Sequence, residues 1–143
     1  MKALFADSFY FIALLRLEDS AHARALAASQ NRTERLITTA WILTEVADAL
    51  AVPAMREGFP RLLAALRADP ACTIVPPTQE LFDRGVELYV RRPDKAWSLT
   101  DCISFVVMRE HDIDEALTGD RHFEQAGFIA LLKYQVGGMA REG

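Results

Sequence analysis

Short apolar runs alternate along the chain with longer segments in which apolar residues recur every three or four positions. The first pattern is typical of buried strands, and the second is typical of helices with one apolar face. Strands are expected at residues 2–6, 36–39, 72–75, 116–118 and 128–132. Helices are expected after Asp7, after Asp19 or Ser20, over residues 41–50 and 61–68, from Thr78 to about Val90, and after Ser98.

This alternation of strands and helices predicts an α/β fold with a mostly parallel central sheet. Parallel neighbours need crossover connections, so helices are expected to cover both faces of the sheet. In sheets of this kind, ligands bind beyond the carboxyl ends of the strands. A length of 143 residues fits one domain, which we place at residues 1–136, with residues 137–143 as a flexible tail.

Composition and charge narrow the possible functions. An apolar fraction of 51% with 25% charged residues is ordinary for a folded α/β protein and argues against a disordered chain. The formal net charge of −4 argues against a simple nucleic-acid-binding module. Binding to a polyanion would therefore need a local basic patch or bound cations.

The cysteines and the N-terminal stretch bear on the compartment. Cys72 and Cys102 form neither a C-x-x-C motif nor a paired framework, which favours reduced thiols. The apolar N-terminal run follows a basic residue as in a signal peptide, but Asp7 interrupts it and no clear cleavage site follows. No segment approaches the ~20 apolar residues of a membrane span. We therefore expect a cytoplasmic protein without membrane contact.

Four acidic residues are expected at the ligand-binding edge of the sheet. Asp7 and Asp120 directly follow predicted strands, whereas Glu45 and Asp101 lie early in helices that lead away from the same edge. Each aspartate also has an ordinary structural interpretation. Asp101 is the third helical residue of a capping box that begins at Ser98, and Asp7 and Asp120 can be N-caps. The argument for a site rests on their joint placement.

Glu45 is the hardest of the four acids to explain structurally. Trp41, Ile42 and Ala49 lie three or four positions from it, so its carboxylate faces the apolar side of its helix. A buried carboxylate needs a partner or a metal, and several acids together repel one another without a counter-cation. Hard cations such as Mg²⁺ prefer oxygen ligands and promote phosphodiester hydrolysis, which makes a nuclease the leading hypothesis.

Other polar residues near these acids are candidates for supporting roles. Hydroxyl groups that can orient the carboxylates or metal-bound water belong to Ser8, Ser104 and Thr118. Basic residues that can contact the phosphates of a nucleic-acid substrate, or simply form a solvated surface, are Arg91, Arg92, Lys95 and Arg121. The three histidines are scattered and show no zinc spacing. Only His122 is set apart, because it follows Asp120 so closely.

The segments F-A-D-S-F, T-E-V, S-L-T-D-C-I-S and T-G-D-R-H-F together resemble the PIN-domain ribonucleases, most closely the toxins of VapBC-type toxin-antitoxin pairs. The resemblance spans nearly the whole chain and implies a three-layer α/β/α domain. It also implies an endoribonuclease in which Asp7, Glu45, Asp101 and Asp120 surround Mg²⁺ or Mn²⁺. By analogy, Asp101 and Asp7 are the main ligands, Asp120 completes the site, and Glu45 binds or orients the metal and its water.

The same resemblance implies an RNA substrate, a small antitoxin protein that blocks the acidic cleft, and a homodimer. One position departs from the common pattern, in which a hydroxyl residue also stands two positions after the first acid. Phe9 occupies that position here. This departure weakens a role for Ser8 and leaves the four acids intact.

Two alternatives remain open from the sequence. A PIN-like domain can bind RNA or a protein as a regulator without cleaving, although retention of all four acids argues against this. A phosphoacceptor domain with Asp7 as nucleophile would need a second acid beside it and a lysine from a later strand end. Asp7 stands alone in its segment, although Lys133 follows the last predicted strand.

Overall fold

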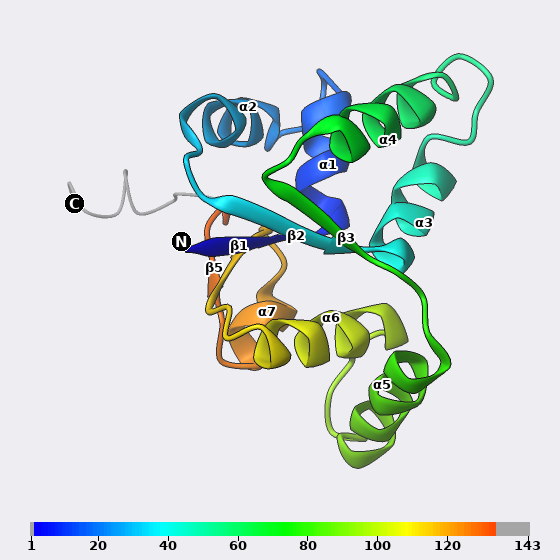
Figure 1. Ribbon diagram of the computed structural model, residues 1–143, viewed down its shortest axis with the longest axis vertical. Coiled ribbons are helices and arrows are strands. Elements are labelled where there is room, and N and C mark those ends of the chain that lie inside the picture. The colour runs from blue at the N-terminus through cyan, green and yellow to red at the C-terminus, as the bar shows by residue number, and fades with distance from the viewer. Residues whose placement is uncertain (1, 134–143) are drawn as a thin grey trace.

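The computed structural model describes residues 2–133 as a five-stranded sheet between two layers of helices (Figure 1). All strand pairings in this part of the chain are parallel, and the spatial order is β3-β2-β1-β4-β5. The strands are β1 (Ala3–Ala6), β2 (Arg35–Thr39), β3 (Cys72–Val75), β4 (Glu115–Leu117) and β5 (Ile129–Ala130). The predicted domain end at residue 136 and the predicted tail at 137–143 lie outside the described residues.

Seven helices of the described chain form the outer layers. One face of the sheet carries α1 (Ser8–Leu15), α2 (His22–Asn31), α3 (Ala40–Ala49) and α4 (Gly58–Ala68). The other face carries α5 (Gln79–Arg91), α6 (Leu99–Glu110) and α7 (Arg121–Gln125), as Figure 1 shows. The predicted three-layer α/β/α architecture is confirmed. No helix of residues 2–133 is both long enough and apolar enough to cross a membrane.

An aromatic cluster fixes the position of α6 and α7 under the sheet. The Phe105 ring meets the rings of Trp97 and Phe123 edge-on, with centroid distances of 5.0 Å in both cases. Phe128 completes the group, with its ring centroid 5.7 Å from that of Phe105. Such aromatic pairs are worth about 0.5–1.5 kcal/mol each beyond the area they bury. The two helices that begin beside the carboxyl ends of the strands are therefore held to a common core.

Helices α5 and α6 approach each other closely where α5 has no side chain. An ideal Cβ built on Gly85 would overlap the side chain of Ile103 and lie 3.3 Å from its Cα atom. Gly85 costs about 1 kcal/mol in a helix relative to alanine. The close approach explains why glycine occupies this position in spite of that cost.

The largest differences from the predicted element boundaries are in α4 and β5. Helix α4 begins at Gly58 rather than near residue 61 and includes Pro60. Proline is tolerated there because the first four N–H groups of a helix have no intrahelical partner. Strand β5 spans two residues instead of five, yet the N–H groups of Leu131 and Leu132 still bond to the carbonyls of Ala116 and Thr118. The chain thus stays beside β4 beyond the strand.

Candidate functional site

The four predicted acids lie at the carboxyl edge of the sheet. Asp7 connects β1 to α1, and Asp120 is the N-cap of α7 after β4. Glu45 lies in α3, which follows β2, and Asp101 lies in the first turn of α6. Asp7 is electrostatically coupled to Asp101 and Glu45, and Glu45 is coupled to Asp101 and Asp120. The structure therefore brings all four carboxyl groups together.

Asp7 is the most deeply buried member of the group. Its side chain is 5% exposed, and the Thr118 hydroxyl donates a hydrogen bond of 2.7 Å to its Oδ2 atom. The pKa of Asp7 is raised from 3.8 to about 7, chiefly by burial, and the charges of Asp101 and Glu45 act in the same direction. The hydrogen bond from Thr118 opposes this rise. Without a cation, the buried carboxyl of Asp7 therefore resists ionisation.

Asp101 combines helix capping with a place in the acidic group. Its backbone N–H donates to Ser98 Oγ at 2.9 Å, and its Oδ2 atom accepts from the Ser98 backbone N–H at 3.0 Å. The predicted capping box is thus confirmed. Burial raises the pKa of Asp101, as does the charge of Asp120, whereas hydrogen bonds from Ser98 and His122 lower it. The cap fixes the orientation of the carboxylate before any ligand binds.

His122 joins two of the acids. Its Nδ1 atom lies 3.0 Å from Asp101 Oδ2 and 3.5 Å from Asp120 Oδ1. Its backbone N–H donates to Asp120 Oδ1 at 2.9 Å, so Asp120 is the N-cap of α7 as predicted. Ligand atoms of Asp101, Asp120 and His122 all lie within 4.8 Å of one another, a spacing that can hold a metal ion. Neither Asp7 nor Glu45 belongs to this compact trio.

Glu45 is half-buried and faces the other three carboxylates. Burial raises its pKa, and the charges of Asp101 and Asp120 act in the same direction. Hydrogen bonding from the hydroxyls of Ser8 and Thr100 lowers it. Ser8, one of the hydroxyl residues predicted to support the site, therefore lies close to Glu45. Thr100 was not anticipated, because a threonine at the second position of a helix carries no signal of its own.

Of the remaining predicted site residues, only some lie beside the four acids. Thr118 contacts Asp7, and its hydroxyl also accepts from the Asp120 backbone N–H at 3.1 Å. Ser104 is fully buried, and its hydroxyl has no hydrogen-bond partner within residues 2–133. Arg91 and Arg121 are exposed. Arg92 pairs with Asp94, and both Arg92 and Lys95 line a cavity beside α6.

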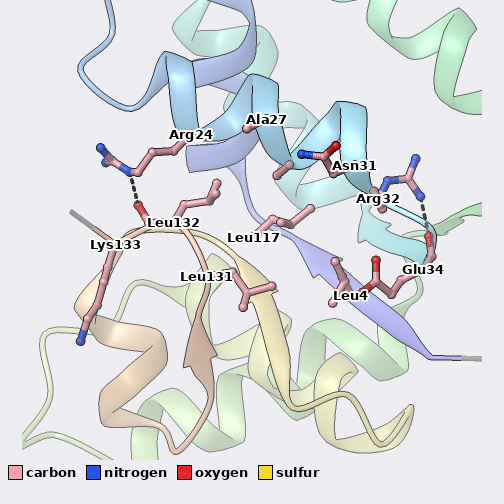
Figure 2. Close-up of a pocket in the computed structure, with 11 residues that line it drawn as sticks. Leu4, Arg24, Ala27, Asn31, Arg32, Glu34, Leu117, Leu131, Leu132 and Lys133 are labelled. Atoms are coloured by element: carbon pink, nitrogen blue, oxygen red, sulfur yellow. Dashed lines mark hydrogen bonds between the residues drawn. The ribbon is translucent and has the colours of Figure 1, made fainter. Parts of the chain in front are cut away.

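Another cavity, of about 400 Å³, is lined by none of the four acids. It opens between α2 and the segment after β5, and its walls include Leu4, Leu117 and Leu131 (Figure 2). Arg24 closes one side by donating to the Leu132 carbonyl at 2.9 Å. The acidic group and this apolar hollow are separate features.

Comparison with known proteins identifies the fold family. The family described as "PIN domain" matches residues 4–129, which is well over half of the chain. The chain belongs to the PIN domain family. The crystal structure of Mycobacterium tuberculosis VapC20, described as a sarcin-ricin loop cleaving toxin, superposes on this PIN domain with a TM-score of 0.80. That match has 26% sequence identity and covers 88% of this chain and 96% of the other.

Sequence comparison gives the same relationship. The PIN domain is 27% identical over 130 residues to proteins named 23S rRNA-specific endonuclease VapC20. They come from two Mycobacterium tuberculosis strains, CDC 1551 / Oshkosh and ATCC 25618 / H37Rv. Each match covers 90% of this chain and 97% of the relative. The resemblance to VapC toxins drawn from the motifs is confirmed.

Proposed function

We propose that this PIN domain is an endoribonuclease that depends on Mg²⁺ or Mn²⁺ and acts as the toxin of a type II toxin-antitoxin pair. The observation that carries the proposal is the convergence of Asp7, Glu45, Asp101 and Asp120 at one edge of the sheet. Support comes from the similarity to VapC20, which is described as an endonuclease specific for 23S rRNA.

The donor atoms of the site fit a hard divalent cation. Carboxylate oxygens dominate the group, and one imidazole nitrogen from His122 stands beside them. This set of donors suits Mg²⁺ or Mn²⁺. Zinc sites, in contrast, are usually built from thiolates or from several histidines. Burial raises the pKa values of Asp7, Glu45 and Asp101, and the charges of neighbouring carboxylates add to this rise; a bound cation would stabilise the charged forms.

In this mechanism, the carboxylates have different tasks. Asp101, Asp7 and Asp120 would hold the cation, with Asp101 and Asp120 offering carboxylate oxygens within 4.8 Å of each other. A bound divalent cation supplies activation of water and stabilises negative charge on the phosphate. Glu45 would accept the proton of the attacking water, and burial, which raises its pKa, makes it a better proton acceptor than an exposed glutamate. Thr118 keeps Asp7 oriented, and Ser8 and Thr100 orient Glu45.

The physiological setting follows from the same relationship. We propose RNA as substrate, a small antitoxin protein as inhibitor, a homodimer as the assembled form, and the cytoplasm as the site of action. The sarcin-ricin loop of 23S rRNA is the first substrate to test, because the related toxin is described as cleaving it. A non-cleaving regulatory domain is the outcome that would replace this proposal.

The decisive experiment replaces Asp101 by Asn. Asparagine keeps the helix-capping geometry and removes the charge, so the fold should survive, as circular dichroism would check. We expect cleavage of a sarcin-ricin loop RNA in Mg²⁺ or Mn²⁺ to fall by at least about 100-fold, because charge stabilisation by a bound metal is worth several kcal/mol. Asp48→Asn is the matched control, since Asp48 is an exposed acid of α3. Undiminished cleavage by Asp101→Asn would refute the mechanism.

A further inference from the structure

A cavity of about 460 Å³ lies at the connection between α5 and α6. Its walls include Tyr89 from the last turn of α5, Arg92 and Lys95 from the following loop, and Trp97. Cys102 of α6 also lines it, and Cys102 directly follows Asp101 in the chain. The cavity thus adjoins the first turn of the helix that carries a central acid of the site.

Arg92 is held in a fixed orientation within this cavity. Its guanidinium lies over the Trp97 ring, 5.1 Å from the ring centroid. Its Nε and Nη2 atoms donate to the two carboxylate oxygens of Asp94 at 3.0 and 2.9 Å. The Arg92 side chain remains 40% exposed in spite of these contacts. A planar, partly accessible guanidinium held in this way is a surface on which a nucleobase can stack.

The loop that carries these groups is fastened to the acidic site. Trp97 is 6% exposed, and its Nε1 atom donates to Gln125 Oε1 at 3.0 Å. Gln125 ends α7, the helix that Asp120 caps at its other end. Trp97 also precedes Ser98, whose backbone N–H donates to Asp101. The cavity and the carboxylates are therefore rigidly related through α6 and α7.

The chemistry of the walls matches single-stranded RNA. Tyr89 is 53% exposed and offers an aromatic face, and Lys95 adds a cation beside the ion pair of Arg92 and Asp94. Four carboxylates repel a polyanion, and the whole chain carries a net charge of −4. A substrate that approaches these acids needs cations close by. Aromatic stacking beside basic side chains is the arrangement that proteins use for single-stranded nucleic acid.

We propose that this cavity, formed by Tyr89, Arg92, Lys95 and Trp97, binds one nucleotide of the RNA beside the phosphodiester that is cleaved. The base stacks on Tyr89 and the guanidinium of Arg92, and Lys95 contacts a phosphate. Trp97 is a positioning residue, because it supports Arg92 from within the core. This inference rests on the proposed ribonuclease function and adds to it a subsite for substrate binding.

The test measures both RNA binding and cleavage. Fluorescence anisotropy with a sarcin-ricin loop RNA uses Asp101→Asn protein in Mg²⁺, so that binding is read without cleavage. In this background, Tyr89→Ala should raise Kd by about 5-fold to about 150-fold, the range for loss of one stacked base. Tyr89→Phe should retain affinity because it retains the ring. Phe82→Ala is the matched control, since Phe82 is an exposed aromatic of the same helix that does not line the cavity.

Two charge variants probe the phosphate contact. Lys95→Ala should weaken binding and reduce the slope of log Kd against log salt by about 0.7, the value for one phosphate contact with a single strand. Asp94→Asn should act in the opposite direction and tighten binding by about two-fold to five-fold, because it removes a nearby negative charge. If the loop had a purely structural role, Lys95→Ala and Asp94→Asn would not change Kd in opposite directions. In cleavage assays without the Asp101 substitution, Tyr89→Ala should raise KM more than it lowers kcat.

The outcomes separate this proposal from the proposed function. If Asp101→Asn abolishes cleavage while Tyr89→Ala and Lys95→Ala keep wild-type Kd and KM, the ribonuclease stands and the subsite is refuted. If these two variants instead lose affinity only for a protein partner, the cavity is a protein-docking surface and the subsite is equally refuted. Graded loss of RNA affinity, with the opposite effect of Asp94→Asn, supports the subsite.

Discussion

Replacement of Asp7 by Asn should stabilise the metal-free protein while it removes activity. The Asp7 carboxyl is buried beside Asp101 and Glu45, and its pKa is raised from 3.8 to about 7. Asparagine is nearly isosteric and stays neutral at every pH. Its amide oxygen can still accept the hydrogen bond that Thr118 donates to Asp7 Oδ2. The substitution therefore removes a buried charge and keeps the local contact.

The size and sign of the effect follow from the pKa of Asp7. Below about pH 4 the carboxyl is protonated in both the folded and the unfolded chain, so it imposes no penalty. Between about pH 4 and pH 7 the unfolded chain releases its proton and the folded chain retains it, so the free energy of unfolding falls with rising pH. A rise from 3.8 to about 7 corresponds to about 4 kcal/mol, at 1.36 kcal/mol per pH unit.

Urea denaturation in EDTA at pH 4, 6 and 8 measures this penalty. Asp7→Asn and the wild type should agree at pH 4, and the variant should be more stable by up to about 4 kcal/mol at pH 8. In melting temperature the difference at pH 8 is roughly 10 °C. Mg²⁺ should narrow the gap by stabilising the wild type. A variant that is less stable at pH 8, or a difference independent of pH, would show that Asp7 carries no such penalty.

Three further predictions test the surroundings of the site. Ser98→Ala should lower the free energy of unfolding by about 1 kcal/mol, because the helix loses its cap. It should also slow RNA cleavage, because Ser98 orients Asp101, and unchanged cleavage would contradict that role. Gly119→Ala should destabilise the protein by about 1–3 kcal/mol, since its Cβ would meet the Phe9 ring at 2.5 Å, and Phe9→Leu in the same chain should recover part of the loss. Mn²⁺ at 100 times its Kd should raise the free energy of unfolding of the wild type by about 2.7 kcal/mol, and Asp101→Asn should remove that gain in the same urea titration.

The sequence predicted the architecture because its signals are local. Apolar runs and helical spacing gave the order of strands and helices, and that alternation implied a parallel sheet. The capping box at Ser98 and the N-cap at Asp120 were readable for the same reason, since each involves residues a few positions apart. The strand order β3-β2-β1-β4-β5 was not readable from periodicity, because it depends on which strands pair in space.

The site was predicted in outline and not in its contacts. Convergence of the acids followed from strand ends that share an edge. The contact between His122 and Asp101 did not follow, because 21 residues separate them and only the packing of α7 against α6 brings them together. The sequence also did not predict how deeply Asp7 is buried. Ser104 illustrates the opposite case, since its spacing from Asp101 suggested a role and the structure leaves its hydroxyl without a partner in the described residues.

The glycine contact between α5 and α6 has a consequence for how this fold can diversify. Gly85 lets α5 rest directly on the backbone of Ile103, so the helix leading to the loop of Arg92 and Lys95 is seated against the helix of Asp101. Under the proposed subsite, substitutions at Tyr89, Arg92 and Lys95 should change RNA binding while this helix contact keeps the acidic centre in place. A graft of a different loop should therefore leave Gly85 unchanged, because any larger residue there would move α5 away from Ile103.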